Sequence, residues 1–310
     1  DGSDASGAPP LSRATLIELS GALASGALTS EALVSAYLER IARFDHDGPR
    51  INAVPLLNPD ALDDARRADA GRAAGGSAGP LQGLPFVVKD SFSVRGMTVA
   101  SGSPAFERLR AMRDAFTVER LREAGAIVLG KTTMAPMAAG GMQRGIHGRA
   151  ESPFNADCLP AAWFSGSSNG SGAALGAGFA AFALAEETLS SGRSPASNNG
   201  LVAYTPSRGV LSIRGNWPFL AIRDVVVPYT RTVADMLLVL DAIVVDDPDA
   251  SGDLWRAQPW VPLPDAGRIR PSSYASLADR DALRGATIAV PGQLVGELPT
   301  TGEPFVLDEG

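Results

Sequence analysis

The segment LPFVVKD, residues 84–90, places a lysine directly after a continuous apolar run. A short run of this kind, with no polar residue at alternate positions, is typical of a strand that is buried on both faces of a sheet. Lys89 would then lie at the end of a buried strand, where an ammonium charge is costly to desolvate. Because lysine can lose its proton when it is buried, and arginine cannot, Lys89 is a candidate base.

The chain of 310 residues has only two lysines, Lys89 and Lys131, among 27 basic residues. Lys131 stands in a Gly130-Lys131-Thr132 sequence, which we interpret as a turn and therefore as a more solvated place. We expect Lys89 to take part in chemistry and Lys131 to be structural.

Outward from residues 84–90, the sequence predicts alternating helices and strands, which is typical of an α/β protein. The helices before residue 75 would pack against the outside of the sheet, and a Gly- and Ser-rich break follows at residues 75–80. Helices are predicted at residues 15–24, 29–41, 60–74, 115–124, 171–177 and 233–244, and strands at 84–88, 126–129, 179–185 and 286–290.

The composition excludes several classes of protein. A net charge of −7 argues against a nucleic-acid binder, which normally needs a basic face. No stretch approaches the roughly 20 apolar residues of a membrane span, and residues 1–10 carry no apolar signal core, so the default location is the cytoplasm. The single cysteine, Cys158, excludes an internal disulfide framework.

Two serine-rich loops flank one predicted helix and strand: SGSSNGSG at residues 165–172 and TLSSGRSPA at 188–196. A flexible linker would not lead into a buried helix, and a phosphate cradle would need a GxxxxGK[ST] lysine or a dinucleotide spacing, which are absent. The remaining interpretation is a site that displays serine hydroxyls at a helix N-terminus. The predicted helix at 171–177 leads the chain away from the first loop, and the predicted strand at 179–185 leads it back. Both loops and Lys89 can therefore lie at one edge of the sheet.

These segments, taken in order, resemble the amidase signature family of serine hydrolases. The resemblance covers roughly residues 10–245. It rests on residues 84–90, the GKT element at 130–132, the serine core at 166–171, the nucleophile segment at 188–196, the PSRG element at 206–209 and the RTV helix entry at 231–233.

The resemblance implies an α/β fold with a mixed central β-sheet covered by helices on both faces. It also implies a single domain over residues 1–310, with N-terminal helices at 11–74 and a catalytic core at 80–245. Family members usually run well beyond the point that matches Gly310, so we expect the C-terminal part to be incomplete.

For the chemistry, the resemblance implies a triad in which Ser191 is the nucleophile, Ser167 relays protons and Lys89 is the base. Ser167 would be held by a cis peptide bond after Gly166. A Ser-His-Asp site is disfavoured because the two histidines stand in Gly-flanked or polar loops. The family also implies backbone N–H groups of Thr188, Leu189 and Ser190 as the oxyanion hole, and a substrate cleft along Met137, Ala138, Ala139, Gly140 and Gly141. It implies no cofactor and no metal.

The nucleophile segment departs from the family at Leu189-Ser190, where the family usually has Gly-Gly. Since glycine adopts backbone conformations that are costly for other residues, we expect a reshaped loop. Arg193 recurs in the family as a structural group, and Glu187, six residues earlier, is its candidate partner.

We therefore expect an amidase that hydrolyses a C–N bond in a small amide or carbamate through an acyl-enzyme, with aryl esters as further substrates. The segment at 188–193 resembles branches that include carbamate-cleaving, urethanase-like enzymes. The alternatives are the transamidating subunit of a Gln-dependent amidotransferase and a non-catalytic, ligand-binding descendant. A monomer or homodimer is expected.

Overall fold

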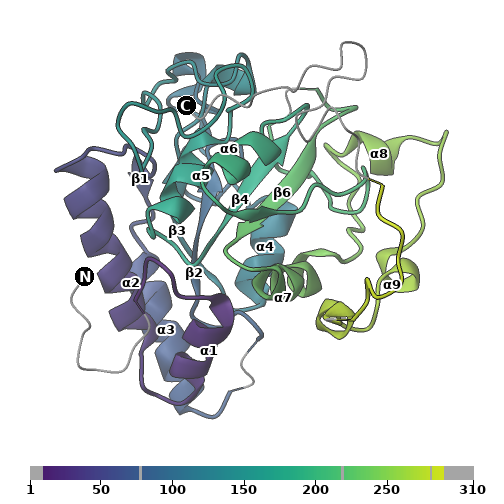
Figure 1. Ribbon diagram of the computed structural model, residues 1–310, viewed down its shortest axis with the longest axis horizontal. Helices are drawn as coiled ribbons and strands as arrows, with labels where there is room; N and C mark the ends of the chain where they lie inside the picture. Colours follow the sequence, from purple (N-terminus) through teal and green to yellow (C-terminus); the bar gives the residue numbers. More distant parts are fainter. Residues whose placement is uncertain (1–9, 77–78, 218–219, 280, 290–310) are drawn as a thin grey trace. The chain divides into compact units, whose positions relative to one another are not determined.

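Figure 1 shows the computed structural model, which describes residues 10–76, 79–217, 220–279 and 281–289. The chain divides into two units, Asp1–Ala275 and Ser276–Gly310. Parts of three predicted features lie outside the described residues: the polar N-terminus, the break at 75–80 and the strand at 286–290.

The first unit contains a six-stranded mixed sheet in the order β1-β3-β2-β4-β6-β5. Strand β2 lies between β3 and β4 and is parallel to both, whereas the β1–β3, β4–β6 and β5–β6 pairs are antiparallel. The strands are β1 (Leu56–Leu57), β2 (Pro85–Lys89), β3 (Ile127–Thr132), β4 (Phe182–Glu187), β5 (Val202–Ala203) and β6 (Val225–Thr230).

Helices cover both faces of this sheet (Figure 1). Helix α4 (Phe116–Glu123) connects β2 to β3, and α5 (Asn169–Gly176) connects β3 to β4. Because β3 and β4 flank β2 on opposite sides, right-handed crossovers place α4 and α5 on opposite faces. Helix α7 (Val233–Ile243) packs with α4, and α6 (Arg193–Asn198) packs with α5. The predicted fold class is therefore confirmed.

The N-terminal helices begin and end close to the predicted positions. They are α1 (Leu16–Ala24), α2 (Ser30–Ile41) and α3 (Ala61–Ala73). Thr15 and Glu18 form a reciprocal capping box at the start of α1, and the Thr29 side chain caps α2. Short helices α8 (Leu254–Ala257) and α9 (Ala266–Ile269) follow α7. Within the described residues, no helix has the length and apolar character needed to cross a membrane.

The centre of the sheet is dry, because every residue of β2, β3 and β4 is buried. Phe86 of β2 and Phe182 of β4 stack with ring centroids 5.0 Å apart. This packing forces the last residue of β2, Lys89, into the protein interior.

Two sequence predictions about the fold are wrong. The strand predicted at residues 286–290 is not found at 286–289, which are exposed and paired with no other strand; Val290 lies outside the described residues. Lys131 is not in a solvated turn but fully buried in β3. The reason is that β3 continues beyond Gly130, where Lys131 lies between Val88 of β2 and Leu56 of β1, both of which pair with it.

Lys131 is neutralised inside the protein by Asp90. Its Nζ lies 2.9 Å from Asp90 Oδ1, and it donates to the backbone oxygens of Asp90 at 3.0 Å and Thr98 at 2.6 Å. Burial lowers the pKa of Lys131, and the Asp90 carboxylate opposes that change. These contacts tie the end of β3 to the residue that follows Lys89.

We predict that Lys131→Met destabilises the protein by about 3–5 kcal/mol, because it leaves the Asp90 carboxylate buried without its partner. Urea denaturation measures the change in the free energy of unfolding. The double variant Lys131→Met/Asp90→Asn is the control and should recover part of the loss. If Lys131→Met alone is as stable as the wild type, the Lys131–Asp90 pair does not contribute this free energy of unfolding.

Candidate active site

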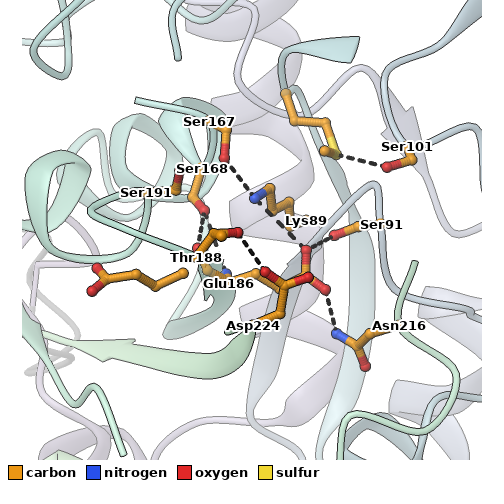
Figure 2. A network of polar contacts seen from close by, with 12 residues as sticks. Lys89, Ser91, Ser101, Ser167, Ser168, Glu186, Thr188, Ser191, Asn216 and Asp224 are labelled. Atoms are coloured by element: carbon orange, nitrogen blue, oxygen red, sulfur yellow. Dashed lines mark hydrogen bonds and ion pairs between the residues drawn. The ribbon is translucent and has the colours of Figure 1, made fainter. Parts of the chain in front are cut away.

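Lys89 and Ser167 meet at the centre of a buried polar network (Figure 2). Lys89 Nζ donates a hydrogen bond to Ser167 Oγ at 2.9 Å. Both residues are almost inaccessible, with exposed fractions of 1% for Lys89 and 0% for Ser167. Strand β2 carries the amine, and the loop that enters α5 carries the hydroxyl. The structure thus places a buried amine within hydrogen-bond distance of a serine, an arrangement suited to proton transfer.

The charge state of Lys89 is set by opposing effects. Burial lowers its pKa, and the carboxylates of Glu186 and Asp224 oppose this. Glu186 Oε2 lies 3.7 Å from Lys89 Nζ. The balance favours an amine that can exist without its proton closer to neutral pH than a solvated lysine does.

The expected cis peptide bond after Gly166 is not found, since no peptide bond among the described residues is cis. A trans bond is the far more stable form outside proline, and here it already brings the Ser167 hydroxyl to the amine. Gly166 has a different function in the loop. A Cβ atom there would lie 2.6 Å from Met142 Sδ and 2.7 Å from Ala161 Cβ, so glycine permits the close approach of these side chains.

The second serine loop, residues 188–192, joins β4 to α6 and is held by Glu187. The Glu187 carboxylate accepts hydrogen bonds from the backbone N–H groups of Gly192 at 3.1 Å and Arg193 at 2.7 Å. It also accepts one from Arg193 Nε at 2.7 Å, which confirms the predicted Glu187–Arg193 pair. The carboxylate therefore closes the loop that contains Ser191.

The two serine loops lie together, as the sequence predicts. Ser168 Oγ donates to the backbone oxygen of Glu186 at 3.0 Å, which links the first loop to β4. The Tyr229 hydroxyl donates to the backbone oxygens of Ser191 and Gly192. Within the described residues, no hydrogen bond joins the Ser167 and Ser191 hydroxyls. The structure thus connects Lys89 to Ser167 directly, and Ser191 only through the surrounding loops.

The Leu189-Ser190 segment does not require glycine. Neither residue has a positive φ, so neither is in the left-handed region where a side chain would be strained. The backbone N–H groups of Leu189, Ser190 and Ser191 donate no hydrogen bond to any other described part of the chain. The Thr188 hydroxyl donates to Asp224 Oδ1 and so anchors the start of the loop. Backbone N–H groups without an acceptor, such as those of Leu189, Ser190 and Ser191, are suited to receive an oxyanion.

The predicted substrate segment forms a tight turn after β3. Met137 and Ala138 have φ values of 50° and 58°, uncommon for residues with side chains and often found at functional sites. The Met142 N–H donates to the backbone oxygen of Trp163 at 2.9 Å, which ties the end of this turn to the chain that leads into Ser167. The turn includes all five predicted residues, Met137, Ala138, Ala139, Gly140 and Gly141.

Sequence reasoning missed four polar residues of the network: Ser91, Glu186, Asn216 and Asp224. Glu186 had a readable signal, because it follows the apolar run of β4 as Lys89 follows that of β2. Asn216 and Asp224 come from irregular segments whose return to the site no local pattern reveals. Among the described residues, no group of three or more His, Cys, Asp or Glu side chains is arranged to hold a metal ion.

The family model named Amidase matches residues 32–301, and the chain belongs to this family. The chain is 33% identical to a subunit of the Glutamyl-tRNA(Gln) amidotransferase of Halorhodospira halophila over 285 residues, which are 91% of this chain and 54% of that protein. An equivalent protein from Acidothermus cellulolyticus is 34% identical over 93% of this chain and 53% of its own length. The chain spans about half the length of the curated relatives that it matches.

Solved structures of amidases are also similar to this chain. The native peptide amidase from Stenotrophomonas maltophilia is similar with a TM-score of 0.74 and 35% identity, over 83% of this chain and 52% of that chain. An amidase family protein from Bacillus anthracis has a TM-score of 0.73 and 31% identity, over 79% of this chain and 49% of that chain.

We predict that Glu187→Ala releases the loop at residues 188–192. Hydrogen bonds to a charged group are each worth about 1.5–3 kcal/mol, so amide exchange at Gly192 and Arg193 should accelerate by about tenfold or more. Hydrogen exchange resolved by mass spectrometry or NMR measures this. Glu123→Ala, which removes an exposed ion pair with Arg120, is the matched control. Unchanged protection at Gly192 would contradict the anchoring role.

Proposed function

We propose that this chain is an amide hydrolase that acts through an acyl-enzyme on Ser191, with Ser167 and Lys89 as the proton relay. The observation that carries this proposal is the hydrogen bond of 2.9 Å between the buried Lys89 amine and Ser167 Oγ. Membership of the Amidase family and likeness to a peptide amidase support chemistry at a C–N bond.

In the proposed reaction, neutral Lys89 takes the proton of the Ser167 hydroxyl while Ser167 takes the proton of Ser191. The Ser191 oxygen then attacks the carbonyl carbon, and the relay returns a proton to the leaving amine. Water releases the acyl group by the same route in a second step. The transfer from Ser191 needs contact between the two hydroxyls, and such contacts often tighten only when substrate is bound.

The oxyanion formed on attack would be received by backbone N–H groups of the 188–191 loop. Leu189, Ser190 and Ser191 supply the N–H groups that the described chain leaves without acceptors. Thr188 would add its own N–H group. Removing one oxyanion donor typically costs about 2.7–4 kcal/mol of transition-state stabilisation. The hydrogen bonds of Glu187, which fix the end of this loop, would therefore affect the reaction rate.

The proposed substrate is a small amide or a carbamate, with aryl esters also possible because they present the same carbonyl. The turn at residues 137–141 would line the acyl side of the cleft, since it is tied to the segment leading into Ser167. A urethanase-like preference is the finer proposal, and it rests on the Leu189-Ser190 variant of the nucleophile segment.

The second candidate is the transamidating subunit of a Gln-dependent amidotransferase. The names of the curated relatives favour it. The net charge of −7 and the absence of a basic run disfavour direct contact with tRNA. Glutaminase activity that appears only with partner subunits would distinguish this candidate.

We predict that a fluorophosphonate probe forms an adduct on Ser191, located by peptide mass spectrometry. The adduct should be lost in Ser191→Ala and kept in Ser194→Ala, which removes a neighbouring hydroxyl. Lys89→Met should slow labelling by about 10²–10⁴-fold, because the relay loses its base. An adduct on a different serine, or none, would favour a binding protein.

The labelling rate should also rise with pH. The reactive form of Lys89 is the neutral amine, and burial lowers its pKa from the ordinary 10.5, so the rate should increase as pH rises through that lowered pKa. A flat profile between about pH 6 and 9 would contradict Lys89 as the base.

A panel of anilides, carbamates and aryl esters tests the substrate class. We expect turnover of at least one class, abolished in Ser191→Ala, with acyl-enzyme trapped on Ser191 at early times. No turnover on any member would count against the hydrolase. Glutamine, tested with and without amidotransferase partner subunits, separates the second candidate from the first.

A further inference from the structure

Glu186 faces the amine of Lys89 from the neighbouring strand. Lys89 is the last residue of β2 and Glu186 the last but one of β4, and these strands are parallel neighbours with Val88 opposite Leu184. We propose that Glu186 is a positioning residue for Lys89: its carboxylate holds the amine beside Ser167 and controls when the amine gives up its proton. The consequence for catalysis rests on the proposed function, in which Lys89 is the base.

The carboxylate of Glu186 is fixed at both oxygens (Figure 2). The Ser91 hydroxyl donates to Oε2, and Asn216 Nδ2 donates to Oε1 at 2.7 Å. The group cannot rotate away from Lys89 without breaking both contacts. Ser91 lies two residues after Lys89, so one short segment carries the amine and also fixes the carboxylate that faces it.

The Lys89 amine is therefore held from two sides. It donates to Ser167 Oγ at 2.9 Å and faces Glu186 Oε2 at 3.7 Å. A carboxylate at this distance attracts the ammonium form strongly, because the side chain of Glu186 is only 11% exposed and water screens the pair poorly. The distance also leaves the amine free to direct its hydrogen bond at the serine.

The other charged groups around the amine leave Glu186 as the main electrostatic partner. Asp224, before β6, is a second and weaker source of negative charge at Lys89. Asp90, at the end of β2, is already paired with Lys131 of β3. Burial raises the pKa of Glu186 and the Lys89 charge opposes this, so each group of the pair favours the charged form of the other.

A purely structural role for Glu186 predicts a different outcome from the proposed one. Glutamine has nearly the same shape and can keep a carbonyl oxygen for Asn216 or Ser91, but it carries no charge. Glu186→Gln would then leave Lys89 unaffected if only the packing matters. If the charge matters, the neutral amine becomes easier to form.

The test uses the rarity of lysine in this chain. With two lysines in 310 residues, ¹³C-lysine labelling gives one ε-carbon signal for Lys89 and one for Lys131, assigned with Lys131→Arg. The pH titration of the Lys89 signal then reports its protonation directly and needs no substrate. In Glu186→Gln the titration midpoint of Lys89 should move to lower pH. At a pH below the midpoints of both the wild type and the variant, the fraction of neutral Lys89 should be about tenfold higher in the variant.

Two variants control the experiment. Glu186→Asp keeps the negative charge but moves it away from Lys89 Nζ, because the side chain is one methylene shorter. The titration midpoint of Lys89 in this variant should lie between those of the wild type and Glu186→Gln. Glu186→Asp also keeps the test decisive if Glu186→Gln does not fold. Asp235→Asn removes a buried carboxylate that caps α1, and it should leave the Lys89 signal in place.

The outcomes separate this proposal from the proposed function. A Lys89 midpoint that stays fixed or moves to higher pH in both Glu186 variants overturns the role of Glu186. If the midpoint moves as expected but Ser191 is never labelled, the hydrolase assignment fails and the hold of Glu186 on Lys89 stands. If the role of Glu186 and the hydrolase function are both correct, the pH at which the Ser191 labelling rate rises should move to lower values in Glu186→Gln, together with the NMR midpoint of Lys89.

Discussion

Everything at the candidate site depends on one amine kept out of water. Lys89 is 1% exposed because β2 is packed on both faces and the amine lies at the end of that strand. Burial favours the neutral amine, while Glu186 at 3.7 Å favours the ammonium ion. A lysine balanced in this way can serve as a base, which neither a solvated lysine nor an arginine could do near neutral pH.

The second lysine shows that burial alone does not make a base. Lys131 is as buried as Lys89, yet its Nζ lies 2.9 Å from Asp90 Oδ1 and donates to two backbone oxygens. Its protons are therefore committed to fixed acceptors. Lys89 instead faces a carboxylate at a longer distance and donates to a hydroxyl that can itself give up a proton. The two lysines therefore differ in their partners and not in their burial.

The sequence predicted the parts of this arrangement that local patterns determine. Apolar runs located β2, β3 and β4, and Lys89 was identified because a charge follows one of these runs, whereas β1, β5 and β6 were not predicted. Lys131 was misjudged because its burial depends on pairing with two other strands, β2 and the two-residue β1, which its Gly-Lys-Thr context does not reveal. Asn216 and Asp224 reach the site from irregular segments. The 286–289 segment has strand-like residues but no partner strand, and pairing is a property of the whole fold.

Strand β4 links Lys89 to the loop that contains Ser191. Successive side chains of a strand point to opposite faces, and here Glu186 faces Lys89 while Glu187 holds Gly192 and Arg193. The register with β6 pairs Glu186 with Val226 and Glu187 with Val225. A slip of one residue would replace one of the two carboxylates, because it would bring either Ala185 to the place beside the amine or Thr188 to the place that anchors the loop. The protonation of Lys89 and the shape of the Ser191 loop are therefore set together by the pairing of one buried strand.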